Sequence, residues 1–459
     1  MADYFNCESC GGLFADPFAY PDYGEDYGVS DYLRYYLELG AGFEAMAAPL
    51  ERVLTAVRPK SFLDVGCGVP VMAGYLQQAF GLDVQALDPS EYAREGGEAL
   101  GVSVLQGHLG DDVLANRTFD LVFASEVVEH AEDPQDFLNR LAAMVSPGGM
   151  VVITTPDAAC VEPGLDALTT LAIAWPDIHH VCHSKPGLEA ALTKAGFAYS
   201  EVFSEGHSLI AFASREKFSL GGPPESKLPA YLAQPFSGLP AFERGNLYRR
   251  LQNAVAHGQW DRAASLTSRL KRRLKKEFSL EFSDAKSLAD KILEGGGDQS
   301  LTALPYFAPL LPFYLAMVDF LGPDRDLAAA RLGLQAQISL CEKFQHDDPL
   351  WWSELGHIYS QARFNLGMVC MMQEKWGDAE IALSPADPPA GSLAAYGRND
   401  PVLALMAACQ RAFATAKNGD KAAGFRQAEE ARSRAGSLPD PAVITGLADT
   451  IQRQIEALS

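Results

Sequence analysis

Two patterns of hydrophobic and polar residues divide the chain. Between residues 61 and 214, short apolar runs alternate with stretches of helical spacing. This alternation predicts an α/β domain with a doubly wound, Rossmann-like parallel sheet, because each strand is followed by a helix that crosses back over the sheet. The expected strands are 61–65, 83–88, 102–105, 119–123, 150–156, 198–204 and 208–214, and the clearest helices are 70–80 and 134–145.

Beyond residue 246 the pattern is helical. Residues 217–246 contain five prolines and four glycines with little periodicity, which predicts a linker. We therefore expect an N-terminal Cys-x-x-Cys and helical cap over 1–58, an α/β domain over 59–216, the linker, and an α-helical domain over 247–459. Candidate helices lie near 247–256, 259–276, 283–294, 325–345, 350–373, 399–416, 420–434 and 441–457.

The first strand runs into a glycine turn, Asp64-Val-Gly66-Cys-Gly68, followed by helical spacing from Val71. Glycine lets the backbone turn tightly and approach a ligand without a Cβ in the way, and the N-terminus of the next helix offers N–H donors. Val71 stands where a dinucleotide motif has its third glycine. The turn therefore predicts a ligand site of another kind, with a tight turn that binds nothing as the alternative.

A second acidic residue follows at the end of the next strand. Asp88 lies twenty residues beyond Gly68. A carboxylate at the carboxyl end of that strand can accept hydrogen bonds from both hydroxyls of a ribose, so we expect an adenosine-containing cofactor there. The segment 106–109 would meet the adenine ring, with a surface aspartate as the alternative interpretation of Asp88.

Four segments together resemble one family. LDVGCG at 63–68, LDPS at 87–90, FDLVFASEVVEHAEDP at 119–134 and SPGGMVVITTP at 146–156 occur in the order and spacing of class I S-adenosylmethionine (SAM)-dependent methyltransferases, particularly the branch with ubiquinone-type and nucleotide-sugar methyltransferases. The resemblance covers roughly residues 60–215. It implies a seven-stranded methyltransferase sheet and SAM as cofactor. The implied cofactor-binding residues are Asp64, Gly66, Gly68, Asp88, Pro89, His108, Leu109 and Ser125.

Histidines supply the candidate catalytic groups. The resemblance places His180 and Ser184 in an insertion that borders the acceptor pocket, and His183 stands where an aromatic residue is expected. His130 follows the fourth strand. Because an imidazole titrates near neutrality, we expect His130, His180 or His183 to act as general base, with surface or supporting roles as the alternative. No carboxylate lies at ligand spacing near His180 and His183, so no metal site is expected.

The N-terminal segment contains the one close cysteine pair. CGGLFADP at 10–17 resembles the segment that precedes the catalytic domain in sugar methyltransferases, where a fuller zinc module is often found. A structural zinc takes four ligands and no second Cys-x-x-C exists, so Cys7 and Cys10 are not expected to bind zinc. A tyrosine-rich stretch over 20–36 then suggests a cap over the sheet.

Charge and cysteine usage narrow the class of partner. The net charge is −22: residues 1–216 carry 10 Lys+Arg against 32 Asp+Glu, whereas residues 217–459 carry 27 of each. Such an acidic surface repels phosphate backbones, so no nucleic-acid partner is expected. The eight cysteines are scattered and no secretory segment precedes them, which suggests a cytoplasmic protein. The uncharged stretch 303–318 is too short for a membrane span and contains three prolines, so we expect a buried, broken helix.

The helical half resembles a tetratricopeptide (TPR) array around Ala362 to Cys370 and Trp376 to Ala379, although a 34-residue period is not sustained. It could bind a protein partner or associate with itself. The leading hypothesis is a SAM-dependent methyltransferase acting on a small molecule such as a sugar or glycan. The alternatives are a SAM-binding scaffold whose helices recruit partners and an oxidoreductase that uses NAD.

Overall fold

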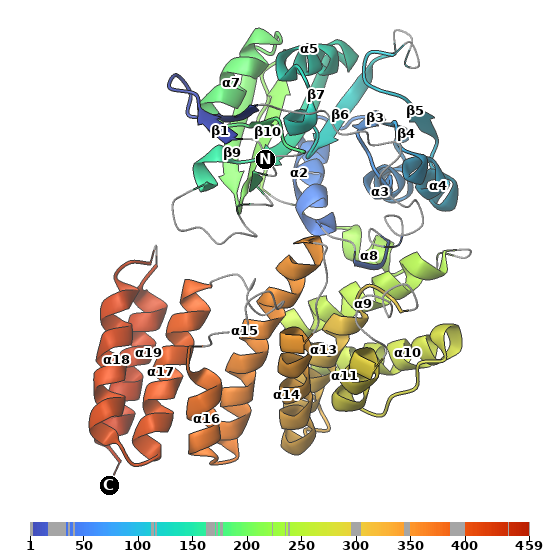
Figure 1. Ribbon diagram of the computed structural model, residues 1–459. Coiled ribbons are helices and arrows are strands. Elements are labelled where there is room, and N and C mark those ends of the chain that lie inside the picture. The colour runs from blue at the N-terminus through green and yellow to red at the C-terminus, as the bar shows by residue number, and fades with distance from the viewer. Residues whose placement is uncertain are drawn as a thin grey trace. The chain divides into compact units, whose positions relative to one another are not determined.

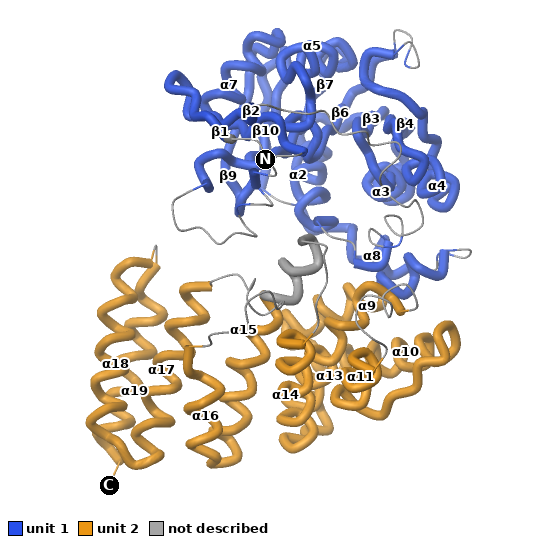
Figure 2. The backbone as a smooth tube through the Cα atoms, in the orientation of Figure 1, with its two compact units in different colours: residues 1–246 blue, residues 247–459 orange. Residues whose placement is uncertain are grey.

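The computed structural model describes residues 3–16, 34, 37–39, 42–111, 114, 117–161, 170, 173–174, 178–222, 224–234, 236, 239–294, 304–343, 349–385, 400–438 and 440–458. The chain forms two compact units, Met1–Asn246 and Leu247–Ser459 (Figure 2). The division falls within one helix, α9 (Pro240–Ala256). The tyrosines of the 20–36 stretch lie outside the described residues.

A seven-stranded sheet organises the first unit (Figure 1). Its strand order is β5-β4-β3-β6-β7-β10-β9, with the first five strands parallel and β10 antiparallel to both neighbours. This confirms the predicted α/β sheet and its closing antiparallel pair. The strands are β3 (Ser61–Val65), β4 (Asp83–Asp88), β5 (Val104–Gln106), β6 (Phe119–Ser125), β7 (Val145–Pro156), β9 (Tyr199–Glu205) and β10 (Ser208–Ser214).

Helices cover both faces of this sheet, and alternation along the strands explains why. On β6, Leu121 and Phe123 point into one core layer, whereas Val122 and Ala124 point into the other. Both layers are buried, so the central strands are apolar on both sides, as parallel strands usually are. The helices of this unit are α2 (Phe43–Ala56), α3 (Val71–Phe80), α4 (Glu91–Leu100), α5 (Pro134–Met144), α7 (Lys185–Lys194) and α8 (Leu228–Leu232), with a 3₁₀ turn η2 (Val128–His130) after β6.

A small second sheet contains the Cys-x-x-Cys segment. Strand β1 (Asp3–Asn6) pairs with β2 (Leu13–Asp16), and β2 pairs with the short β8 (Val181–Cys182). The N-terminal hairpin is therefore bound to the histidine-containing insertion, 165 residues or more away in the sequence.

Residues 217–246 are not a linker. Helix α8 and the start of α9 lie in this segment, and Tyr231 and Phe242 are buried in the same core layer as α2 and α3. Glu51 of α2, itself buried, accepts hydrogen bonds from Ser226 Oγ at 2.9 Å and from Lys227 N at 3.0 Å. The linker prediction relied on the prolines and glycines and did not consider the large apolar residues between them. Five of these complete the core: Leu228, Tyr231, Leu232, Phe236 and Phe242.

The second unit is helical in the part that the structure describes, and each predicted helix has a counterpart. The broken apolar stretch forms a 3₁₀ turn, Ala308–Leu310, that leads into the buried helix α13. None of the described helices is long and apolar enough to cross a membrane. After α9 the helices are α10 (Trp260–Phe278), α11 (Ala285–Glu294), α13 (Leu311–Leu321), α14 (Leu327–Lys343), α15 (Pro349–Met372), α16 (Trp376–Leu383), α17 (Pro401–Lys417), α18 (Lys421–Ala435) and α19 (Ala442–Glu456).

Replacing Tyr231 by alanine tests whether 217–246 belongs to the core of the first unit. Tyr231 is 1% exposed and its ring lies 5.3 Å from that of Tyr75 and 5.4 Å from that of Phe236. Loss of a buried aromatic side chain should lower the free energy of unfolding by about 3–5 kcal/mol, measured by urea denaturation. Tyr199→Ala is the control, since Tyr199 is 44% exposed. Equally small effects of the two substitutions would contradict this placement and support the prediction that residues 217–246 are a linker.

Candidate functional site

The glycine turn lies at the carboxyl edge of the parallel strands, where ligands bind in open α/β sheets. Gly66 N–H donates to Leu87 O at 2.8 Å, and Gly68 N–H donates to the Asp88 carboxylate at 2.8 Å. The ends of β3 and β4 are thus joined through the turn itself. Both glycines have left-handed backbones, with φ +65° and +50°, which explains why the turn requires glycine.

Asp88 is buried and accepts three hydrogen bonds within the turn. Besides Gly68, the backbone N–H and the hydroxyl of Ser90 donate to it. A carboxylate has about four lone-pair sites, so about one remains for a ligand, rather than the two expected from the sequence. Gly107 N–H donates to Asp88 O at 3.3 Å, which brings the segment with His108 and Leu109 beside Asp88. His108 and Pro89 are exposed, and Leu109 is half-buried.

Asp64 is the second buried carboxyl group at this edge, only 5% exposed. Burial, followed by the charge of Asp88, raises its pKa to about 7, and a hydrogen bond from the backbone of Ala73 partly opposes this shift. Asp64 therefore joins the end of β3 to helix α3, at a cost in stability whenever it is ionised.

Gly66 connects the turn to the loop after β6. A Cβ added at Gly66 would lie 2.6 Å from Val127 Cγ2. A larger residue at 66 would therefore collide with Val127, so substitution there disturbs the protein itself. At Gly68 an added Cβ would approach only Tyr92, at 3.8 Å. Sequence patterns singled out neither residue: Val127 lies within the 119–134 segment without a predicted role, and Tyr92 lies outside the four segments.

The loop after β6 contains polar side chains that β7 supports. Ser125 Oγ lies 2.7 Å from Thr154 Oγ1, and Thr154 Oγ1 also donates to Glu126 at 2.8 Å. Glu129 is fully buried, and Thr155 Oγ1 donates to its Oε2 at 2.9 Å. Burial, followed by the charge of Glu126, raises the pKa of Glu129 well above its ordinary value.

The segments that contain His130 and His180 lie side by side and are joined by hydrogen bonds. His180 N–H donates to Glu129 O at 2.7 Å, and His180 Nδ1 lies 3.3 Å from Ala131 O. His130 packs against His179, with ring centroids 4.9 Å apart. Burial, followed by the charge of His179, lowers the pKa of His130 to about 4. Burial also lowers the pKa of His179.

His183 lies apart from this group in its contacts. Its carbonyl accepts from Ala158 N at 2.9 Å, and the residue is 8% exposed. Burial lowers its pKa to about 4. Within the described part of the chain, its Nε2 has no hydrogen-bond partner. Of the three predicted catalytic histidines, His130 and His180 are thus linked through the backbone of Glu129 and Ala131.

The N-terminal hairpin holds the histidine segment in place. Tyr4 Oη donates to His179 O at 2.7 Å, and Ala15 N–H donates to His180 O at 2.9 Å. Ser184 Oγ donates to Cys10 O at 2.6 Å. The Cys-x-x-Cys turn therefore supports the start of α7, and the hairpin strands support the histidines before it.

The structure places a carboxylate beside the clustered histidines. The sequence spacing suggested that no carboxylate accompanies the clustered histidines, but folding places Glu129 beside His130 and His179, with one ligand atom of each within 4.8 Å of the others. His179 was not among the predicted site residues, whereas Glu129 was expected only as a group near enough to orient a histidine base. A long-range contact between the loop after β6 and the turn before β8 brings them together, and no local spacing reports it.

Comparison with known proteins identifies the same stretch of the chain. Residues 36–202 match the model of a family described as a methyltransferase domain. Ubiquinone biosynthesis O-methyltransferase of Rickettsia conorii is 31% identical over 156 residues, which are 32% of this chain and 50% of that protein. The protein named probable tocopherol O-methyltransferase, chloroplastic, of Oryza sativa subsp. japonica is 29% identical over 158 residues, 32% of this chain and 42% of that protein. The chain spans half or less of these relatives.

Two solved structures of methyltransferases are also similar to part of this chain. An O-methyltransferase family protein from Burkholderia thailandensis covers 40% of this chain and 59% of its own, with 18% identity and a TM-score of 0.35. Human N-acetylserotonin methyltransferase in complex with SAM covers 41% and 56%, with 15% identity and a TM-score of 0.34.

Replacement of Asp64 by asparagine should change the pH dependence of stability. The pKa of Asp64 in the folded protein, about 7, exceeds its ordinary value of 3.8, so the folded state retains a proton that the unfolded chain loses. Stability from this group therefore falls as the pH rises from about 4 to 7. The free energy of unfolding of the asparagine variant should rise relative to that of the wild type across this pH range, by at most a few kcal/mol at pH 8. Urea unfolding without cofactor at pH 4, 6 and 8 measures this, and parallel profiles would contradict it.

Proposed function

We propose that this chain, whose residues 36–202 are a class I SAM-dependent methyltransferase domain, transfers a methyl group to a hydroxyl of a small molecule. The observation that carries the proposal is the glycine turn at the carboxyl edge of β3 and β4, with Asp88 bonded to Gly68 N–H at 2.8 Å. The turn lies within the matched residues, and the curated relatives named above are O-methyltransferases.

The residues of the turn are suited to the cofactor. Gly68 has space beside its backbone, since an added Cβ would touch only Tyr92, at 3.8 Å. The remaining lone-pair site of Asp88 can accept from one ribose hydroxyl, and the segment with His108 and Leu109 can approach the base. Ser125, at the end of β6, lies on the same edge of the sheet. When bound, SAM supplies an activated sulfonium methyl group.

The protein then needs to position the acceptor and remove its proton. Orientation of two reactants supplies much of the rate, because the reaction is a single in-line displacement. We propose His180 as general base: it lies beside the loop after β6, and its segment is bonded to Glu129. His130 and His183 are weaker candidates, since a pKa of about 4 makes an imidazole a poor acceptor for a hydroxyl proton. The hydroxyl oxygen forms the new bond to carbon as the base receives the proton.

A sugar or glycan is the proposed class of acceptor. Residues 10–17 of this chain, CGGLFADP, resemble a segment of sugar methyltransferases, and this resemblance supports the proposal. Strand β2 lies in this segment and pairs with β8, next to His180. In such a protein the hairpin would shape the acceptor side of the site.

We also propose that the helical unit is a TPR-like array for a protein partner or for self-association. Small residues support close helix packing: an added Cβ at Gly367 of α15 would lie 2.3 Å from Leu383 of α16, and one at Gly424 of α18 would lie 2.5 Å from Ala412 O of α17. The scattered cysteines support a cytoplasmic location.

Asp88→Ala should weaken SAM binding. The substitution removes a charge-assisted ligand contact, worth about 1.5–3 kcal/mol, and it also removes the acceptor that holds Gly68 N–H. We expect at least about a tenfold higher Kd by isothermal titration calorimetry. Asp83→Ala is a matched control on the same strand, because Asp83 is exposed. Wild-type affinity in Asp88→Ala would remove this carboxylate from the cofactor site.

His180→Ala should lower turnover without changing SAM affinity. Loss of a general base costs about 10²–10⁴-fold in rate, measured as release of S-adenosylhomocysteine with a panel of phenols, sugars and sugar-linked acceptors. His257→Ala, an exposed histidine of the helical unit, is the control. Full activity in His180→Ala would exclude His180 as the base. SAM binding by the wild type without turnover on any acceptor would favour a scaffold role instead.

A further inference from the structure

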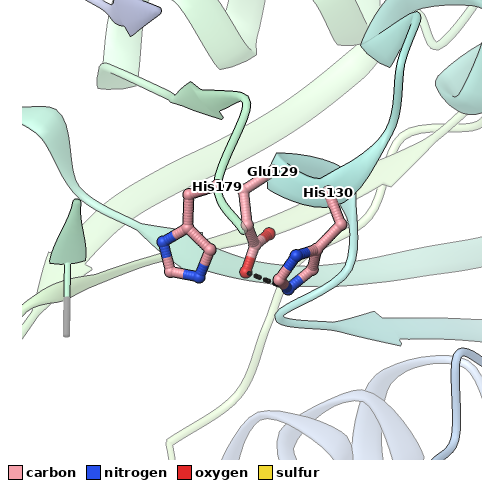
Figure 3. Close-up of side chains that lie close together, drawn as sticks. All are labelled: Glu129, His130 and His179. Atoms are coloured by element: carbon pink, nitrogen blue, oxygen red, sulfur yellow. Dashed lines mark ion pairs between the residues drawn. The ribbon is translucent and has the colours of Figure 1, made fainter. Parts of the chain in front are cut away.

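We propose that Glu129, His130 and His179 form a binding site for a divalent transition-metal cation, with Zn²⁺ the best match. Figure 3 shows the Glu129 carboxylate between the two imidazole rings, with one ligand atom of each residue within 4.8 Å of the others. Glu129 and His130 belong to η2, and His179 lies just before β8. Neither the methyltransferase family match nor the proposed methyl transfer requires this site.

The hydrogen bonds of the two rings select the nitrogen that a metal needs. His130 Nδ1 lies 3.0 Å from Ile178 O, and His179 Nδ1 lies 2.9 Å from Ile173 O. A carbonyl oxygen only accepts, so a proton on Nδ1 satisfies this contact in each ring and leaves the lone pair of a neutral ring on Nε2. A further backbone hydrogen bond joins His130 to Glu126. A histidine that binds a metal usually donates its other N–H to a backbone carbonyl or carboxylate in this way. The same bond in both rings therefore prepares two Nε2 ligands.

Glu129 provides the independent observation that points to a ligand. Its side chain is fully buried, and Oε2 accepts from Thr155 Oγ1 at 2.9 Å. Among the described residues, its Oε1 has no hydrogen-bond partner. That oxygen faces His130 Nε2 at 3.8 Å, beyond hydrogen-bond distance. A buried carboxylate oxygen without a donor is costly, and a cation between Oε1 and the two Nε2 atoms would satisfy it.

The ligand set and its dimensions identify the class of ion. Two histidines and one glutamate with an open fourth position are a ligand set of catalytic zinc sites, and imidazole favours Zn²⁺ and its neighbours over Mg²⁺ or Ca²⁺. At Zn–N and Zn–O distances of 2.0–2.2 Å, tetrahedral ligand atoms lie about 3.3 Å apart. The present separations, up to 4.8 Å, therefore require side-chain movements of about an ångström, within the reach of small rotamer adjustments.

The position of the site suggests what the ion would contact. Glu129 follows Val127 by two residues, and Val127 lies against the position of a Gly66 Cβ. The open coordination position would thus be near the glycine turn and next to His180, whose N–H is bonded to Glu129 O. An acceptor hydroxyl bound there would be polarised by the ion, a step that rests on the proposed methyl transfer. Metal binding itself does not depend on it.

The test measures metal binding by the full-length protein, independently of activity. Chelator-treated protein is equilibrated with Zn²⁺, and the bound metal is counted by elemental analysis and its affinity measured by competition with a chelator. We expect one Zn²⁺ per chain that depends on the three residues. Glu129→Gln and His179→Ala should each weaken it by at least about tenfold, the loss typical even of residues that only orient a ligand. His257→Ala and Cys10→Ser are the matched controls for an exposed histidine and for adventitious thiolate binding, and both should keep it.

Co²⁺ substitution in the wild type keeps the test independent of variant folding. A site of nitrogen and oxygen ligands gives visible ligand-field absorption without a thiolate charge-transfer band, which supports the proposal. A thiolate band, loss of Zn²⁺ in Cys10→Ser, or no stoichiometric Zn²⁺ in the wild type would overturn it. SAM calorimetry on the same preparations separates the two hypotheses: Zn²⁺ binding without SAM binding leaves this site standing and removes the proposed function, and the reverse result removes only the metal site.

Discussion

Three carboxyl groups are held out of water at one edge of a parallel sheet, and the site depends on how the fold supports them. Asp64, Asp88 and Glu129 are each at most 5% exposed. Removing such groups from water is unfavourable unless hydrogen bonds or opposite charges replace the water. Backbone and hydroxyl donors do so almost completely for Asp88 and only partly for Asp64 and Glu129, so the site is built at some expense of stability. Functional sites commonly show this conflict between local rules and the global fold.

The hydrophobic core of the first unit offsets this loss of stability. The central strands are buried on both faces, and their two core layers include segments from both ends of the unit. Residues 217–246 close one layer, and the N-terminal hairpin pairs with β8 and holds the histidine segment by Tyr4 and Ala15. Segments that flank the matched residues 36–202 therefore belong to the same structural unit as the sheet. The 1–58 cap, the sheet and the 217–246 segment are not independent modules.

The arrangement also separates the roles of the histidines. The half-buried His130 and the buried His179 share a cluster with Glu129, and Nδ1 of each ring faces a backbone carbonyl oxygen. His180 differs from these two. It is half-buried, and its backbone N–H donates a hydrogen bond to the carbonyl oxygen of Glu129. The proposed metal-binding pair beside the proposed proton acceptor His180 is a coherent arrangement for a reaction at a hydroxyl, because both groups would act on the same oxygen.

What the sequence determined by itself is local. The apolar runs and the glycine turn predicted β3, β4 and β6 almost to the residue, because strand periodicity and left-handed glycine are properties of a few consecutive residues. Tertiary structure alone decided the rest. The pairing of Glu129 with His179, the collision of a Gly66 side chain with Val127 and the burial of Tyr231 in the sheet core all join residues about fifty or more positions apart. Such contacts depend on which loops and faces the sheet brings together, and no spacing along the chain encodes that.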